Sequence, residues 1–250
     1  ECRVPLHPLN FLDATCSIGP CFTSIMPPET DWSAGSLLKT MDRFGIAEAC
    51  PASGLAEDYV DDHGNRQLLE ECQNHDRFHP VWIVSPHYSG EFPRPDVLLE
   101  QLASHNVRLV KMVLNSLNGY LSSLDVPQCT ALFDALAAAR VPIIFDFYDF
   151  ASIRSQTILD VRREWPELPV ILTFPKIAKK TRMPSFLFEE CDNLHITLSG
   201  YQLMGGIEHL ADRFGAGVLI YGSHYPFFTP LQSMMQLIYS DITDHDKKLI

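Results

Sequence analysis

The sequence predicts a single (β/α)8 barrel domain that spans residues 1–250. Eight short runs rich in β-branched and aromatic residues alternate with seven longer segments whose apolar residues have helical spacing. Strands joined by helices of this length pair in parallel through right-handed crossovers. Eight such strands within 250 residues favour a closed barrel over the alternative, an open doubly wound sheet.

The predicted strands are short and largely apolar. Two of them contain the continuously apolar runs Ile143-Ile144-Phe145 and Val170-Ile171-Leu172, which are typical of parallel strands covered on both faces. In chain order, the eight strands are expected at Phe11–Ser17, Glu48–Ser53, Phe78–Ser85, Val107–Leu114, Val141–Phe147, Pro169–Phe174, His195–Ser199 and Val218–Gly222.

Helical segments separate these strands, and several carry signals for their ends. Leu37, Met41 and Phe44 form one apolar stripe, which Gly45 ends. Pro127 suits the first turn of another helix. The last residues of the sequence resemble the start of an eighth helix that is cut short. The seven helices between strands are expected at residues 33–44, 64–74, 95–105, 127–139, 152–164, 184–191 and 206–214.

The net charge and the apolar runs of the sequence limit the kinds of partner to be expected. The formal net charge is −12 and the pI is about 5.2. This acidity argues against nucleic acid and against an anionic membrane surface as partners, because both need a basic face. No apolar run reaches the roughly 18 residues of a spanning helix. We therefore expect a small-molecule ligand, and a homodimer through the outer helices is compatible with this composition.

The cysteines indicate the redox compartment. There are seven, an odd number, and they are scattered without a C-x-x-C pair. A disulfide framework favours an even, dense set in a shorter chain. The sequence also has no N-x-S/T glycosylation site. These observations favour a cytoplasmic protein.

Familiar catalytic signatures are absent from the sequence. It contains no G-x-G-x-x-G, no Walker loop, no H-E-x-x-H and no G-x-S-x-G. Nicotinamide-dependent, nucleotide-hydrolysing and serine-hydrolase functions therefore lack their usual signals.

Polar residues instead gather at the predicted C-terminal ends of the strands, where barrel enzymes place their chemistry. Alternation along each strand predicts which side chains face the barrel interior. In the first strand, Phe11, Asp13, Thr15 and Ser17 are expected to share one face, with Cys16 on the other. The polar residues expected to converge at the mouth are Thr15, Ser17, Lys111, Asp146 and His224.

Each of these residues has an expected role. His224 ends the last strand and is a candidate catalytic acid or base, because imidazole transfers protons near neutral pH. Asp146 is the second catalytic candidate, and it orients water or substrate. Lys111 is expected to hold an anionic group of the substrate, although an ion pair with Asp146 is an alternative for both. The remaining substrate-binding candidates are Thr15, Ser17, His87 and Tyr225.

Two segments of the chain resemble motifs of the amidohydrolase-related family of metal-dependent barrels. Phe11-Leu12-Asp13-Ala14-Thr15-Cys16-Ser17-Ile18-Gly19 resembles its F-x-D-x-H-x-H-x-G, and Gly222-Ser223-His224-Tyr225-Pro226 resembles its G-[ST]-D-x-P. The segment that ends at Lys111 resembles the family's fourth strand. The resemblance implies an amidohydrolase-like barrel and a hydrolase or a lyase.

The sequence departs from the family at the positions of the metal ligands. The two first-strand histidines fall on Thr15 and Ser17, and the last-strand aspartate falls on His224. The fifth- and sixth-strand histidines fall near Asp146 and Phe174. Zinc needs three or four good donors, and hydroxyl groups are poor ones. We therefore expect no cofactor, with a bound zinc ion as the less favoured alternative.

Two functions follow from these departures. The first is a hydrolase or lyase that acts on a small carboxylated or carbonyl substrate without the usual metal site. The alternative is a non-catalytic barrel that binds a ligand or serves as a subunit. The loss of four ligand positions at once motivates this alternative.

Overall fold

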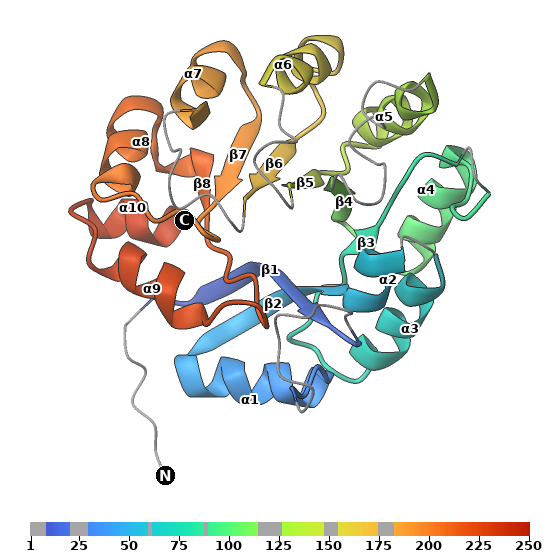
Figure 1. The fold of residues 1–250 in the computed structure, drawn as a ribbon, viewed down its shortest axis with the longest axis horizontal. Coiled ribbons are helices and arrows are strands. Elements are labelled where there is room, and N and C mark those ends of the chain that lie inside the picture. Colours follow the sequence, from blue (N-terminus) through green and yellow to red (C-terminus); the bar gives the residue numbers. More distant parts are fainter. Residues whose placement is uncertain are drawn as a thin grey trace.

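Strands and helices alternate around a central barrel (Figure 1). The fold comes from a computed structural model, which describes residues 9–20, 30–59, 62–87, 90–114, 127–147, 155–174 and 183–250. All eight predicted strands are present, although the third and eighth are much shorter than their apolar runs. The strands are β1 (Phe11–Ile18), β2 (Ile46–Ser53), β3 (Trp82–Ile83), β4 (Val110–Leu114), β5 (Ile143–Phe147), β6 (Val170–Thr173), β7 (Leu194–Thr197) and β8 (Leu219–Ile220).

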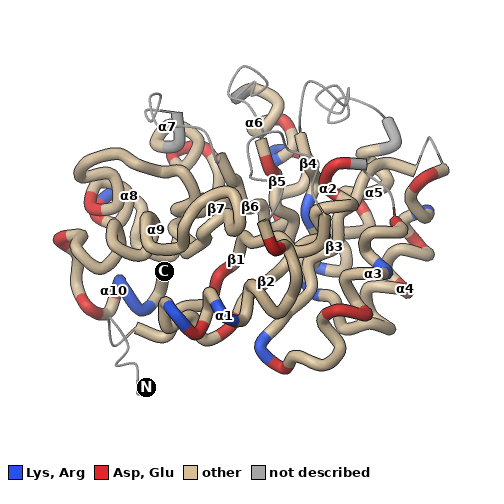
Figure 2. The backbone as a smooth tube through the Cα atoms, turned by 60° about the horizontal axis from the view of Figure 1, so that its bottom comes forward, with Lys and Arg blue, Asp and Glu red and all other residues tan. Residues whose placement is uncertain are grey.

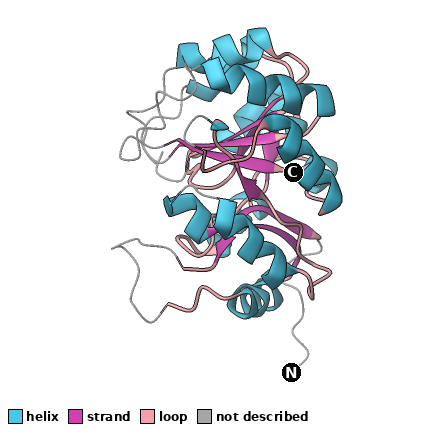
Figure 3. Cartoon of the chain, turned by 90° about the vertical axis from the view of Figure 1, so that its right-hand side faces the viewer, coloured by secondary structure: helices cyan, strands magenta, loops and turns pink. Residues whose placement is uncertain are grey.

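The helices lie on the outer side of the strands (Figure 3). The seven predicted helices are confirmed, and α10 lies where the start of an eighth helix was expected. Two more, α2 and α9, were not predicted from the sequence patterns. The helices are α1 (Ala34–Phe44), α2 (Gly54–Tyr59), α3 (Asp62–Cys72), α4 (Pro95–Ser104), α5 (Pro127–Ala139), α6 (Ser155–Glu164), α7 (Met183–Glu190), α8 (Gly206–Phe214), α9 (Pro230–Ile238) and α10 (Asp244–Leu249).

Parallel pairing closes the barrel. Strands β3 to β8 form one sheet in chain order, and β1 pairs with β2. The bridge between Ala52 and Val81 joins these two sheets on one side, and the bridge between Cys16 and Tyr225 joins them on the other. The open doubly wound sheet is therefore excluded.

The side chain of Asn65 supplies hydrogen bonds to β3 where this strand lies beside β2. The Asn65 carboxamide donates from Nδ2 to the carbonyl of Ile83 at 2.8 Å and accepts from the amide of Ile83 at 2.9 Å. Asn65 lies on α3 and is buried. It satisfies backbone groups of the two-residue strand β3 that would otherwise lack a partner in the interior.

Strand β1 contains an irregularity that simple alternation does not anticipate. Asp13 pairs with Ala49 and Cys16 pairs with Pro51, so three steps on β1 oppose two on β2. An extra residue of this kind reverses the facing of the side chains beyond it. Phe11 accordingly lies in the same outer core as Cys16. The expectation that Phe11 shares a face with Thr15 and Ser17 is wrong for this reason.

Two apolar clusters hold the fold together. The larger one lies between the strands and the outer helices and includes Leu37, Met41, Phe133 and Phe145. The smaller one fills the barrel interior. It consists of Cys50, Ala52, Ala56, Val81, Ile83, Phe92, Ile144 and Ile171. Inward-facing residues of strands β2, β3, β5 and β6 thus form an apolar plug inside the barrel.

Acidic and basic residues are interspersed along the outer helices (Figure 2). In the part of the chain that the structure describes, no helix combines the length and the hydropathy that crossing a bilayer requires.

Candidate active site

A buried group of charged side chains lies at the C-terminal end of the barrel. Lys111 extends from β4 and Asp146 from the end of the neighbouring strand β5, as the sequence predicts. Ser17 comes from the end of β1, and Glu57 comes from α2, which directly follows β2. We call these four residues the Lys111 cluster.

Short contacts connect all four members of the Lys111 cluster. The Nζ atom of Lys111 lies 2.6 Å from Oδ2 of Asp146 and 2.7 Å from Oε1 of Glu57. The hydroxyl of Ser17 donates to the same Oε1 atom of Glu57 at 2.8 Å. The structure therefore brings Ser17, Lys111 and Asp146 together, and it adds an acid that the sequence analysis missed.

The environment of Lys111 keeps its ammonium group charged. Burial alone would lower the pKa of this lysine, but the negative charges of Asp146 and Glu57 outweigh burial and raise its pKa above the usual range. Its side chain is only 3% exposed. Since two carboxylates face one ammonium group, the positive charge of Lys111 is compensated within the protein.

Helix α2 positions Glu57. The hydroxyl of Ser53 accepts from the amide of Ala56 at 3.2 Å and so caps the first turn after β2. Gly64 lets α3 pack closely, because a Cβ atom there would lie 2.6 Å from the Ala56 nitrogen. An acid four residues beyond a predicted strand end was the available signal for Glu57. A six-residue helix is too short to show helical periodicity.

Two pairs of hydroxyl groups complete the polar layer. Oγ1 of Thr15 and Oγ of Ser199 are 2.7 Å apart, and the Thr197 hydroxyl donates to that of Thr173 at 2.7 Å. All four residues are buried. The sequence did not point to Ser199, Thr173 and Thr197, because hydroxyl residues at strand ends carry little signal on their own.

His224 lies on an aromatic segment that follows β8. Its backbone has a φ of 58°, and its amide donates to the Thr15 carbonyl at 2.6 Å. Its ring stacks on Phe227 with centroids 5.1 Å apart and lies 5.7 Å from Phe228. Trp32 in turn contacts Phe227 edge-on. The imidazole is therefore fixed in an aromatic setting and is partly exposed to solvent.

The other two substrate-binding candidates lie in different surroundings. The Tyr225 hydroxyl is 3.1 Å from that of Ser36 on α1, so this side chain contacts an outer helix. His87 follows β3 in the chain and is partly buried. Its Nδ1 atom is buried and has no hydrogen-bond partner in the described part of the chain.

The donors at this end of the barrel do not fit a site for a transition metal. Thr15 and Ser17 offer hydroxyls, and Phe174 stacks on Phe147 at 5.2 Å instead of supplying a ligand. The carboxylates of Glu57 and Asp146 are bound to Lys111. Among the residues that the structure describes, no group of three His, Cys, Asp or Glu side chains is arranged to hold a metal ion.

No family model and no curated protein matches the sequence. Solved structures, however, match it over nearly its whole length. The 5-carboxyvanillate decarboxylase of Sphingomonas paucimobilis superimposes with a TM-score of 0.73 at 12% identity, covering 97% of this chain and 96% of that one. This chain therefore shares the (β/α)8 barrel fold of that decarboxylase. The resemblance that the two strand motifs indicated is thus confirmed at the level of the fold.

Two further structures of this fold carry bound ligands. A probable 2-pyrone-4,6-dicarboxylic acid hydrolase from Acinetobacter baumannii, with citric acid bound, has a TM-score of 0.70 at 13% identity. It covers 97% of this chain and 96% of its own. A dihydroxybenzoic acid decarboxylase from a Polaromonas species, with manganese and 2-nitroresorcinol bound, has a TM-score of 0.69 at 14% identity. It covers 97% of this chain and 94% of its own.

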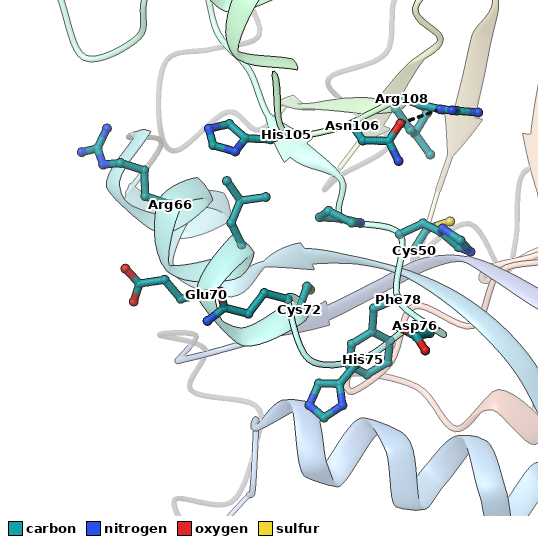
Figure 4. A pocket seen from close by; sticks show the side chains of 15 residues that line it. Cys50, Arg66, Glu70, Cys72, His75, Asp76, Phe78, His105, Asn106 and Arg108 are labelled. Carbon is teal, nitrogen blue, oxygen red and sulfur yellow. Dashed lines mark hydrogen bonds between the residues drawn. The ribbon is translucent and has the colours of Figure 1, made fainter. Parts of the chain in front are cut away.

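A separate cavity of about 920 Å³ opens at the opposite end of the barrel. Figure 4 shows the side chains that line it. It lies between the C-terminal half of α3 and the segments that lead into β3 and β4. His75 and His105 line it, together with Arg66, Glu70 and the buried thiol of Cys72. The N-terminal end of a barrel usually serves stability, so we assign no catalytic role to this cavity.

Proposed function

We propose that this protein is a hydrolase or a lyase that acts on a small carboxylated or carbonyl compound without the usual metal site. The Lys111 cluster carries the proposal, because it places a charged ammonium group between two carboxylates at the C-terminal strand ends. The named structures of the same fold include decarboxylases and a probable hydrolase of carboxylated compounds. That likeness supports the substrate class proposed here.

In this proposal, Asp146 and His224 are the catalytic residues. Lys111 fixes the Asp146 carboxylate through one of its oxygens, and the other oxygen orients water or substrate. His224 transfers a proton to or from the reacting group. Because both carboxylates balance the charge of Lys111, we assign it the role of orienting them in place of holding a substrate anion.

The remaining candidates contact the substrate. Thr15 and Ser17 would donate hydrogen bonds to a ligand oxygen, exchanging the partners they have in this structure. His87 is the best placed to form a new bond, because its buried Nδ1 lacks a partner among the described residues. Tyr225 would approach the substrate from the turn after β8.

Turnover of a panel of lactones and carboxylated aromatic compounds tests this function. After metal removal with a chelator, we expect turnover to persist, and we expect Asp146→Asn and His224→Ala to lower kcat by about 100-fold or more. A Tyr239→Phe variant, at an exposed position on the outside of the barrel, serves as the control. Full turnover by His224→Ala would remove His224 from the mechanism. Strict dependence on added manganese would refute metal independence.

A non-catalytic barrel is the second candidate, and the hydroxyl pairs favour it. Thr15 with Ser199, and Thr173 with Thr197, satisfy one another, and Lys111 is compensated by its own neighbours. A barrel mouth whose polar groups hydrogen-bond to one another resembles a site that has lost its metal-dependent chemistry. Absence of turnover across the panel, combined with ligand-induced thermal stabilisation, would support this candidate over the enzyme.

A further inference from the structure

Two members of the Lys111 cluster stand at or near positions that the family resemblance assigns to metal ligands. Ser17 stands where the second histidine of the first strand is expected, and Asp146 stands near the histidine of the fifth strand. Both belong to the cluster, where Glu57 bridges Ser17 and Lys111. The Nζ atom of Lys111 is therefore the group that makes these residues unsuitable for a transition metal.

The two carboxylates converge on that one atom. Oδ2 of Asp146 and Oε1 of Glu57 lie 2.6 and 2.7 Å from Nζ. A calcium ion binds oxygen at about 2.3–2.6 Å, so an ion at the position of Nζ would need only small movements of these oxygens. Side-chain oxygens are the ligands that calcium and manganese prefer. The ammonium group thus occupies the position between the two carboxylate oxygens that a cation would take.

We propose that the Lys111 ammonium group is the internal cation of this barrel, which balances Glu57 and Asp146 in place of a divalent ion and blocks such an ion from binding. Without the lysine, two buried carboxylates would face each other with no positive charge between them. Buried charges of one sign are costly unless a partner compensates them. A variant that lacks the ammonium group should therefore acquire a divalent cation.

Thermal unfolding of Lys111→Ala with and without calcium or manganese tests this inference. The shortened side chain removes the charge and leaves room for an ion with its water. We expect the melting temperature of this variant to rise by about 3 °C when the ion is present at ten times its Kd, while the wild type shows no comparable rise.

Lys111→Met is the matched control. It also removes the charge, but its side chain still fills the space that the ion would need. We expect it to be destabilised like Lys111→Ala and not to be stabilised by the ion. Adding Asp146→Asn to Lys111→Ala should abolish the response. An equal response in the wild type and in Lys111→Ala, or none in Lys111→Ala, would overturn the proposal.

A second measurement remains decisive if Lys111→Ala does not fold. Manganese binding is followed by electron paramagnetic resonance in the wild type and in Asp146→Asn. We expect the wild type to bind no more manganese than the variant does. One manganese ion bound through Asp146 in the wild type would show that Lys111 does not block the site. The inference rests on only one part of the proposed function, namely that the protein does not use the usual metal site. Both measurements record binding or stability. Their results can therefore be interpreted even if the protein proves not to be an enzyme.

Discussion

Asp13 on β1 is hydrogen-bonded twice to Ser223, across the seam where the barrel closes. Its Oδ1 accepts from the Ser223 amide at 2.8 Å, and its Oδ2 accepts from the Ser223 hydroxyl at 2.5 Å. The carboxyl group is fully buried. Burial raises the pKa of Asp13 to about 6, even though the hydrogen bonds from Ser223 and Thr15 act to lower it.

This raised pKa makes stability depend on pH. Between about pH 4 and 6 the folded protein binds a proton at Asp13 that the unfolded chain has released, so this residue's contribution to stability falls as the pH rises through that window. The contribution is largest below about pH 4, and the loss is complete above about pH 6, with a size of about 3 kcal/mol. Urea unfolding across this range measures it.

Asp13→Asn is the variant that isolates the effect. The amide keeps an acceptor for the backbone amides of Ser223 and Thr15, and its nitrogen can donate to the Ser223 hydroxyl. We expect the variant to lose the decrease in stability between about pH 4 and 6 that the wild type shows. Identical pH profiles for the two proteins would contradict the assignment.

The charge balance of the Lys111 cluster predicts unequal effects of its substitutions. Lys111→Met leaves two buried carboxylates uncompensated and should cost about 3–5 kcal/mol of unfolding free energy. Glu57→Gln leaves one lysine facing one aspartate, so we expect a smaller loss. Denaturant unfolding of both variants checks the order. A larger loss for Glu57→Gln would mean that helix α2 depends on that carboxylate more than on the charge balance.

The absence of a side chain at Gly222 permits the contact between Thr15 and Ser199. A Cβ atom at Gly222 would lie 2.2 Å from Oγ1 of Thr15. Gly222→Ala should therefore destabilise the protein by about 1–3 kcal/mol through overpacking. In a Thr15→Ala background the cost should be smaller, and a double-mutant cycle measures the coupling. Additive effects of the two substitutions would contradict direct contact.

Arg162 joins two loops at the N-terminal end of the barrel. From α6, its guanidinium donates to the carbonyls of Trp165 at 2.8 Å, of Pro166 at 2.8 Å and of Asp192 at 2.7 Å, and also to that of Leu168. Arg162→Lys keeps the charge but cannot match this forked geometry. We expect a loss of about 2–4 kcal/mol from the broken bonds, measured by thermal unfolding. Arg163→Lys, at the exposed neighbouring position, is the control and should change stability little.

Much of the barrel could be predicted from local sequence. The apolar run at Ile143-Ile144-Phe145 lies in β5, and the stripe ended by Gly45 forms α1, where Gly45 has a φ of 75°. These features depend on neighbouring residues alone. Strand β3 was placed correctly, but it is reduced to two residues, because the side chain of Asn65 takes over bonds that a strand neighbour would make.

Part of the candidate site could also be predicted from local sequence patterns. Alternation from Leu109 and from Ile144 correctly directs Lys111 and Asp146 into the barrel, where they meet. Alternation failed in β1, because the extra residue between Asp13 and Cys16 changes which side chains face inward. Such an insertion depends on the register with β2, which a single strand does not encode.

The sequence by itself determined the order and parallel pairing of the strands and the approach of Lys111 and Asp146, because these follow from periodicity within each segment. Only the tertiary structure decided that Glu57 joins them. That contact depends on a short capped helix packed against Gly64 and on a separation of 54 residues between Glu57 and Lys111. Charge compensation at a barrel mouth is a property of several strand ends at once, and no local pattern specifies it.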